Sequence, residues 1–181
     1  MEEKYLHDKW RMYGLTPYNL SPIQKGIQFG HAVVEYMLDF GQHDHTLAWA
    51  NDNKTFIILN GGTTNDTPGR LGTLNMHLQT LKDFLPNWSR ATFNEPDLGD
   101  QLTAIVFLVP EQVYNKTDYP DFEDSIKTLK QCISMDDNTR VGYAGALKEE
   151  GHEVYKAWLK SMGGQDNVMM REFLNQFNLA N

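Results

Sequence analysis

The fold is decided by residues 21–40, which read SPIQKGIQFGHAVVEYMLDF. Ser21 is a favoured residue just before a helix, and Pro22 suits the first helical position. Gln24 stands three residues after Ser21 and completes a capping box, in which the two side chains satisfy free backbone N–H groups. Gly41 follows the last apolar residue and is a common helix terminator. The sequence therefore predicts a helix from Pro22 to about Phe40.

The predicted helix has apolar residues around more than half of its circumference, at about 100° per residue. We therefore expect it to be mostly buried, with one narrow polar stripe. Polar groups on a buried helix need partners, and two interpretations stay open: the stripe lines a pocket, or Glu35 pairs with His31 in a purely structural role. The apolar residues are Ile23, Ile27, Val34 and Leu38, with Phe29, Val33, Met37 and Phe40 beside them, and the stripe is Gln24, Gln28, His31 and Glu35.

Segments typical of strands surround this helix. A short strand at 13–15 precedes it, and the apolar, β-branched run 55–59 (TFIIL) follows it. After the loop 60–65 (NGGTTN), leucines at helical spacing predict a helix from about Thr73. Residues 90–94 and 102–109 then form a predicted hairpin across the turn 95–100. This order predicts an α/β fold, with a mixed four-stranded sheet flanked by helices.

The C-terminal third reads as helical. Three segments with one apolar side are expected, one near 122–133, one near 141–161 and one after Gly163-Gly164 that carries Met169, Phe173 and Phe177 on one side. We therefore expect an α/β domain over residues 1–115 and a helical extension over 116–181. The extension is expected to pack on the domain or to form a dimer interface.

Composition narrows the classes of function. The 181 residues are 40% hydrophobic, which predicts a globular chain, and the formal net charge is −8. Nucleic-acid binding depends on clustered Lys and Arg, so we expect a small ligand rather than a long nucleic acid. With one cysteine (Cys132), no leader-like stretch and no membrane-spanning stretch, a cytoplasmic location is expected. No metal or cofactor motif is present; His43 and His45 read as solvated loop residues.

Two segments resemble type 2 peptidyl-tRNA hydrolases. Residues 24–32 (QKGIQFGHA) are similar to the first-helix pattern G-K-x-A-A-Q-x-x-H-A of that family, with Gln28, His31 and Ala32 at matching positions. Residues 97–105 (DLGDQLTAI) look like its acidic turn and the strand that follows, with Thr103 at the position of the family's threonine. The resemblance covers about residues 12–110 and implies the same α/β architecture.

The resemblance also implies where catalysis would differ. The family's catalytic lysine falls on Gln24, a neutral residue that cannot supply the same charge, while Lys25 points about 100° away. The family's catalytic aspartate falls on or near Asp97, with Glu95 as an alternative occupant. If the chain is an enzyme, the candidate catalytic residues are His31, Asp97 and Lys25.

The chain also resembles small accessory proteins of tailed bacteriophages, some of which are oligomers that sequester nucleotide immune signals. This implies a homodimer in the host cytoplasm that binds a nucleotide-derived small molecule. Such a protein would act as an anti-defence sponge, which sequesters the signal and so blocks the host's immune response. The alternatives are a hydrolase of peptidyl-tRNA or of a nucleotide signal, and an interaction protein that acts through residues 116–181. The expected ligand-binding residues are Gln24, Gln28, His31, Asn60, Gly61, Thr63, Glu95, Asp97 and Thr103.

Overall fold

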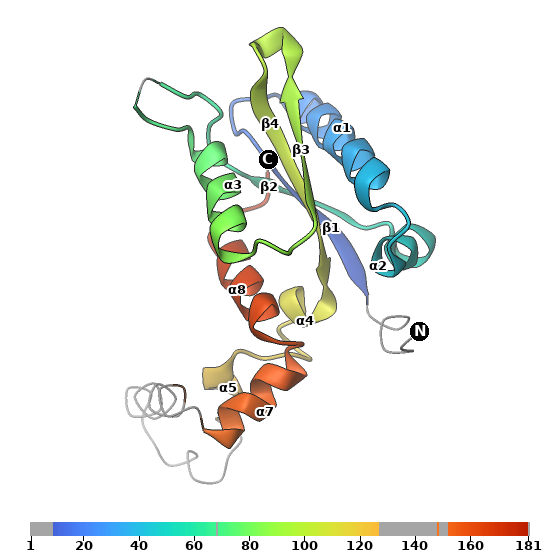
Figure 1. The fold of residues 1–181 in the computed structure, drawn as a ribbon, viewed down its shortest axis with the longest axis vertical. Coiled ribbons are helices and arrows are strands. Elements are labelled where there is room, and N and C mark those ends of the chain that lie inside the picture. The colour runs from blue at the N-terminus through green and yellow to red at the C-terminus, as the bar shows by residue number, and fades with distance from the viewer. Residues whose placement is uncertain (1–8, 68, 127–147, 149–151, 181) are drawn as a thin grey trace. The chain divides into compact units, whose positions relative to one another are not determined.

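A computed structural model describes residues 9–67, 69–126, 148 and 152–180 (Figure 1). The chain divides into two compact units. Unit 1 comprises residues 1–111 and 174–181, and unit 2 comprises residues 112–173. None of the helices in the described ranges is long and apolar enough to cross a membrane. Cys132 and most of the predicted helix at 122–133 lie outside the described residues.

Unit 1 is built on a four-stranded sheet in the order β2-β1-β4-β3. The strands are β1 (Trp10–Thr16), β2 (Phe56–Asn60), β3 (Arg90–Glu95) and β4 (Gln101–Pro110). β1 pairs in parallel with β2, whereas β4 runs antiparallel to both β1 and β3. The predicted mixed α/β sheet is confirmed, and so is the β3–β4 hairpin. β1 begins earlier than the predicted strand, at Trp10.

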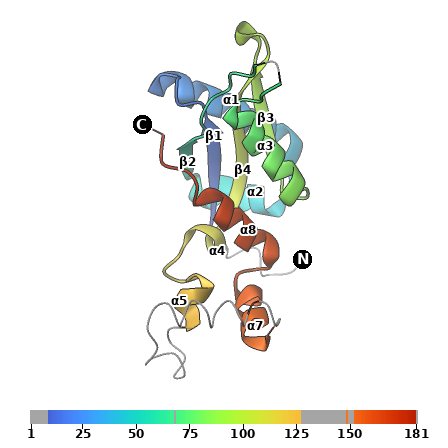
Figure 2. The same ribbon diagram turned by 90° about the vertical axis from the view of Figure 1, so that its left-hand side faces the viewer.

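Helices cover both faces of the sheet, with α1 (Pro22–Phe40) on one face and α3 (Thr73–Phe84) on the other (Figures 1 and 2). Successive strand residues point to opposite faces. A Cβ atom added at Gly14 would lie 2.4 Å from the Phe29 ring of α1, and Leu74 of α3 lies on the side of Leu15. Between α1 and β2 come α2 (Asp44–Ala48) and a π-helical turn at Trp49–Asn53.

The orientation of α1 corrects the sequence prediction. The bounds and the capping box are confirmed, because the Gln24 N–H donates to Ser21 Oγ and the Ser21 N–H to Gln24 Oε1. The helix is not mostly buried, however. Its core side carries Lys25, Gln28, Phe29, Ala32 and Tyr36. Of the predicted apolar residues, Phe29 is buried and Val33, Met37 and Phe40 pack against the core, whereas the other four are exposed. Their exposed fractions are 78% for Ile23, 48% for Ile27, 58% for Val34 and 75% for Leu38.

The C-terminal segment of unit 1 runs along β2. The Asn60 N–H donates to Asn178 O, and the Ala180 N–H to Ile58 O, each at 2.9 Å. The Phe177 ring meets the His77 ring of α3 edge-on, with centroids 4.7 Å apart. Phe177 therefore lies beyond α8 (Gln165–Leu174) and not on the predicted helical side with Phe173. The described chain thus closes one edge of its own sheet.

Acidification is expected to weaken this C-terminal attachment. Burial lowers the pKa of His77 below its usual value. A base whose folded-state pKa is lowered binds protons better in the unfolded chain. Its contribution to stability is therefore present above the unfolded pKa of about 6.5 and decreases as the pH falls below it. Urea unfolding at neutral and mildly acidic pH will show a smaller pH-dependent loss for His77→Gln than for the native chain. An equal loss in both proteins would contradict this assignment.

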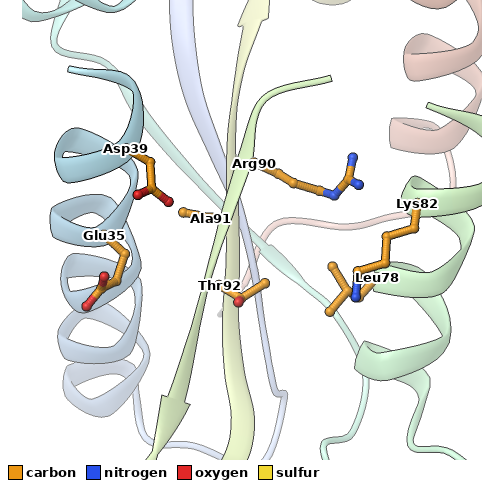
Figure 3. A pocket seen from close by; sticks show the side chains of 7 residues that line it. All are labelled: Glu35, Asp39, Leu78, Lys82, Arg90, Ala91 and Thr92. Carbon is orange, nitrogen blue, oxygen red and sulfur yellow. The ribbon is translucent and has the colours of Figure 1, made fainter. Parts of the chain in front are cut away.

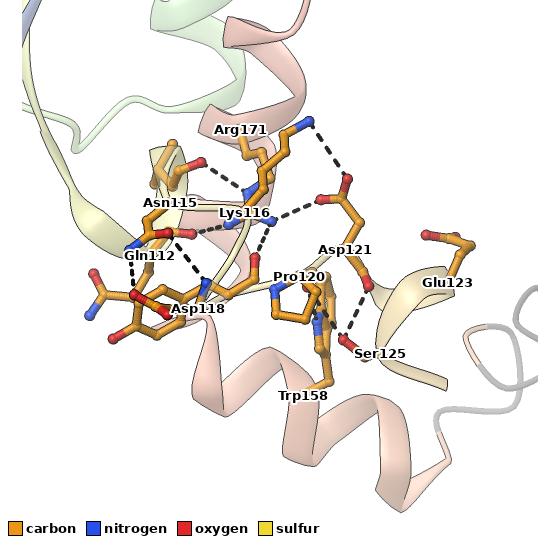
Figure 4. A network of polar contacts seen from close by, with 12 residues as sticks. Gln112, Asn115, Lys116, Asp118, Pro120, Asp121, Glu123, Ser125, Trp158 and Arg171 are labelled. Carbon is orange, nitrogen blue, oxygen red and sulfur yellow. Dashed lines mark hydrogen bonds and ion pairs between the residues drawn. The ribbon is translucent and has the colours of Figure 1, made fainter. Parts of the chain in front are cut away.

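Unit 2 contains the short helices α4 (Glu111–Tyr114, whose first residue belongs to unit 1) and α5 (Phe122–Ile126), with α7 (Glu153–Ser161) and most of α8. A helical C-terminal extension is therefore confirmed for the described residues. Arg171 of α8 is buried and donates hydrogen bonds to Val113 O, Tyr119 O and Gln112 O (Figure 4). It also pairs with Asp121 at 2.8 Å. One side chain thus fixes the loop between α4 and α5.

Candidate functional site

The predicted site residues gather at one end of the sheet. β3 runs in the same direction as β1 and β2, because both β1 and β3 are antiparallel to β4. The carboxyl ends of these three strands therefore lie at the same end, where Asn60 and Glu95 close their strands and β4 begins at Gln101, two residues before Thr103. α1 starts at this end as well, after the loop that follows β1. Open α/β sheets usually bind ligands at the carboxyl ends of their strands.

A β-bulge gives Thr103 its position. Phe93 pairs with Ala104, but the next residue, Asn94, pairs with Leu102, so Thr103 is the extra residue of β4. A bulge redirects a side chain that regular alternation would send to the other face. Thr103 is buried, and its hydroxyl reaches Gln28 Oε1 of α1 at 2.6 Å. Ala104 on one side of it belongs to the core beneath α1.

Gln28 links this hydroxyl to a carboxylate. Its side chain is 8% exposed, and its Nε2 donates to Glu95 Oε2 at 2.5 Å. A carboxylate only accepts hydrogen bonds, so the amide nitrogen must face Glu95 and the amide oxygen must face Thr103. The three residues come from α1, β3 and β4 and form one connected group, which we call the Gln28 cluster. Both ends of Gln28 are used, so its side chain is held in one orientation.

Two further residues border the Gln28 cluster. The ring of His31, one turn along α1, lies against the Phe93 ring with centroids 4.5 Å apart. Asp97 stands in the 3₁₀ turn Pro96–Leu98 after β3, where its N–H approaches Glu95 Oε1 at 3.5 Å and its side chain is exposed. His31 is exposed as well, so Glu95 and His31 present polar groups outward above the buried pair of Gln28 and Thr103.

Gln24 and Lys25, the two residues at and beside the position of the family's lysine, lie on different sides of α1. Gln24 is exposed, and its side chain accepts the Ser21 N–H, so it serves as a helix cap. Lys25 is buried, at 7% exposure, on the core side of the helix. Lys25 and Gln28 stand three positions apart and are separated by only about 60° around the axis. The charged residue of the first turn therefore shares a face with Gln28, which the comparison of sequences did not reveal.

The loop after β2 has an internal set of hydrogen bonds. The Gly61 N–H donates to Thr16 O, the Gly62 N–H to Asn60 Oδ1, and the Thr63 N–H to Thr73 Oγ1. These bonds fix the predicted ligand residues of this loop against β1 and the start of α3. Thr16 itself ends β1 wholly buried, and its hydroxyl has no hydrogen-bond partner among the described residues. Buried polar groups normally have hydrogen-bond partners, so water or a ligand group at this end of the sheet would satisfy the Thr16 hydroxyl.

The site residues that sequence reasoning missed are Thr16 and Phe93. Phe93 lies two residues before the turn 95–100, and the spacing of aromatic residues alone does not predict its ring contact with His31. No group of three or more His, Cys, Asp or Glu side chains could hold a metal ion within residues 9–67, 69–126, 148 and 152–180. The arrangement offers a hydroxyl, an amide, a carboxylate and an imidazole.

No family model and no curated protein matches this sequence. The assignment of a function therefore depends on the chemistry of the Gln28 cluster and on the arrangement of the sheet. Both can be tested directly on the purified protein.

Proposed function

We propose that this chain binds and sequesters a nucleotide-derived small molecule at the Gln28 cluster, with an architecture like that of type 2 peptidyl-tRNA hydrolases. The observation that carries the proposal is the fixed orientation of Gln28 between Thr103 and Glu95. Polar side chains locked by neighbours bind ligands with little loss of conformational entropy. In a bacteriophage, such a sponge would act in the host cytoplasm against nucleotide signals of defence.

The groups around the cluster fit the parts of a nucleotide. The free lone pairs of the Glu95 carboxylate can accept hydrogen bonds from ribose hydroxyls or from an exocyclic amine. The exposed His31 imidazole, which packs at a tilt of 56° against the Phe93 ring, offers a flat surface for a base. A net charge of −8 disfavours a long polyanion more than a compact ligand that contacts only local groups.

Catalysis is the second candidate, and one observation favours it. Lys25 is buried on the face of α1 that carries Gln28, so a lysine shares this face with the cluster although Gln24 replaces the expected lysine. A lysine there could stabilise negative charge that develops on an ester during hydrolysis. In this alternative, His31 and Asp97 would supply acid or base chemistry. The substrate would be peptidyl-tRNA or a nucleotide signal.

A thermal-shift panel tests the proposal. Cyclic dinucleotides, ADP-ribose derivatives and mononucleotides are each mixed with the native chain, with Gln28→Leu and with Gln42→Leu. Gln28→Leu removes both hydrogen bonds and leaves Glu95 without its amide donor, so ligand affinity should fall by about tenfold to a hundredfold. Gln42 is exposed and distant from the cluster in sequence, and its variant should bind as the native chain does.

The outcomes are distinct. Stabilisation by one class of nucleotide that is lost in Gln28→Leu and kept in Gln42→Leu supports the Gln28 cluster as the site. Stabilisation that survives in Gln28→Leu places the ligand elsewhere. No stabilisation of the native chain by any member of the panel rejects a nucleotide-derived ligand.

Assembly as a homodimer is part of the proposal, and the outward face of α1 is its best support. Ile23 and Leu38, and likewise Ile27 and Val34, are placed symmetrically about the point between Gly30 and His31. Antiparallel packing against a second copy about a two-fold axis would therefore bring each exposed apolar residue onto another. Gly30 has open space around it and would let the two helices approach closely.

Sedimentation measurements test this dimer with Val34→Glu. A carboxylate in the centre of the apolar face should shift a concentrated native dimer to the mass of a monomer, because the charge would be buried without a partner. Gln42→Glu makes the same change of charge outside the face and should leave the mass unaltered. A native chain that is monomeric at every concentration, or a Val34→Glu protein that stays dimeric, would contradict this interface.

A further inference from the structure

One edge strand of the sheet, β2, is covered by another segment of the chain, whereas the other edge strand, β3, is not covered by any segment that the structure describes. The outer edge of β2 is covered by residues 178–180, which donate and accept backbone hydrogen bonds there. β3 lies at the other edge, and no strand in the part of the chain that the structure describes pairs with its outer side. An open edge presents unpaired backbone N–H and C=O groups, and natural proteins usually cover or block such an edge.

A cavity of about 240 Å³ lies along this open edge. α1 forms one wall and α3 the other, with β3 between them (Figure 3). Ala91 of β3 is buried beneath α1, whereas Arg90 extends towards α3. An added strand would sit between the two walls, with its alternate side chains directed to α1 and to α3. The lining residues are Glu35, Asp39, Leu78, Lys82, Arg90, Ala91 and Thr92.

The two walls carry opposite charges. Glu35 and Asp39 stand four residues apart on α1, an arrangement in which like charges repel. Neither side chain has an ion pair or a hydrogen bond with a described residue, and the same holds for the side chain of Lys82 on the α3 wall. Arg90 is already used, because its Nη1 donates to Leu85 O at 2.9 Å and to Trp88 O at 3.1 Å. The acidic wall therefore lacks a counter-charge, and so does Lys82.

We propose that the open edge of β3 binds an extended peptide segment of a partner protein as a fifth strand of the sheet. Its side chains directed to α1 are lysine or arginine, and those directed to α3 are acidic or small and polar. Backbone hydrogen bonds to β3 supply affinity, and the two charged walls select the sequence, as in other cases of strand addition. This site is separate from the Gln28 cluster and does not depend on the proposed ligand.

Charge also argues against a second copy as the occupant. Antiparallel pairing of two β3 edges about a two-fold axis keeps both α1 helices on the same face of the joined sheet. Glu35 and Asp39 of one copy would then approach the same residues of the other, and like charges across an interface oppose association. A basic segment of another protein meets the acidic wall without this repulsion.

The test uses the full chain and a short fluorescein-labelled peptide in which lysine alternates with serine and glutamate. Fluorescence anisotropy measures its affinity, and amide hydrogen exchange measures protection of residues 90–95. We expect binding together with slower exchange across β3. A peptide of the same composition in scrambled order should bind more weakly, and one N-methylated at its internal amides should not bind, because it cannot donate backbone hydrogen bonds.

Charge reversal supplies the matched variants. The double variant Glu35→Lys and Asp39→Lys should weaken binding by about tenfold or more, since two attractive charges become repulsive. Asp52→Lys with Glu172→Lys makes the same change of net charge at exposed positions outside the cavity and should leave the affinity within a factor of about two.

Each remaining result would overturn the proposal. These results are no binding by the native chain, binding without protection of β3, equal loss in both double variants, or equal affinity for the scrambled peptide. Protection of the same residues that grows with protein concentration in the absence of peptide would identify a second copy as the occupant instead.

Discussion

Replacing Arg171 with methionine is expected to lower the free energy of unfolding of unit 2 by about 3–5 kcal/mol, the cost of breaking a buried charged network. Arg171 is 3% exposed, and its guanidinium donates hydrogen bonds to three backbone carbonyls and to the Asp121 carboxylate. Methionine fills part of the volume but leaves these acceptors without donors. Lysine keeps the charge but lacks the planar arrangement of donors, so Arg171→Lys should recover only a small part of the loss.

Hydrogen exchange followed along the chain measures this effect. The amides of α7 and α8 should exchange faster in Arg171→Met, whereas those of β1 and β4 should keep their native rates. Asp121→Asn is the control, since Asp121 is 38% exposed and its loss should cost much less. Native exchange rates in unit 2 of Arg171→Met would show that the network is not needed for its stability.

Replacing Gly14 with alanine is expected to destabilise unit 1 by about 1–3 kcal/mol, as overpacking of a core does. The added Cβ would lie 2.4 Å from two carbons of the Phe29 ring and 3.1 Å from Val106 Cγ1. Phe29 must then move, and with it the middle of α1, which carries Gln28 one residue away. Denaturant unfolding of Gly14→Ala measures the loss, and ligand affinity should fall along with stability.

A second substitution makes this prediction specific. Phe29→Leu shortens the side chain that clashes, so Gly14→Ala should cost less in the Phe29→Leu background, with a coupling energy of about 0.5–3 kcal/mol. Gly26→Ala is the control, because its Cβ would meet no atom within 4 Å and alanine favours a helix. Strictly additive effects of Gly14→Ala and Phe29→Leu would contradict the close approach of α1 to β1.

The sequence predicted the first and last residues of α1 correctly, but not which side of the helix faces the sheet. The bounds follow from local chemistry, because Ser21, Gln24 and Pro22 act on neighbouring backbone groups. The direction in which the helix faces does not follow, because a helical wheel gives only the angles between residues. Two apolar arcs were present, and the one with Phe29 packs on the sheet while the one with Leu38 is exposed.

The site was predicted in part for a similar reason. Gln28 and Thr103 were singled out by their positions in two short motifs, and the structure brings them within hydrogen-bond distance. Their contact depends on the bulge, which no local pattern around Thr103 announces, since bulges arise from the pairing of two strands. The burial of Lys25 likewise depends on which arc of α1 meets the sheet. The Gln28–Thr103 contact and the burial of Lys25 therefore depend on strand pairing and helix packing between distant segments, which local sequence does not reveal.

The claim that the chain sequesters its ligand is tested most directly by measuring whether the bound nucleotide is recovered intact. The nucleotide that stabilises the native chain most is incubated with an equimolar amount of protein, the protein is denatured, and the released ligand is identified by mass spectrometry. Sequestration at the Gln28 cluster predicts recovery of the intact nucleotide after binding, with no binding by Gln28→Leu. Recovery of hydrolysed products from the native chain would contradict it and would assign catalysis to this site.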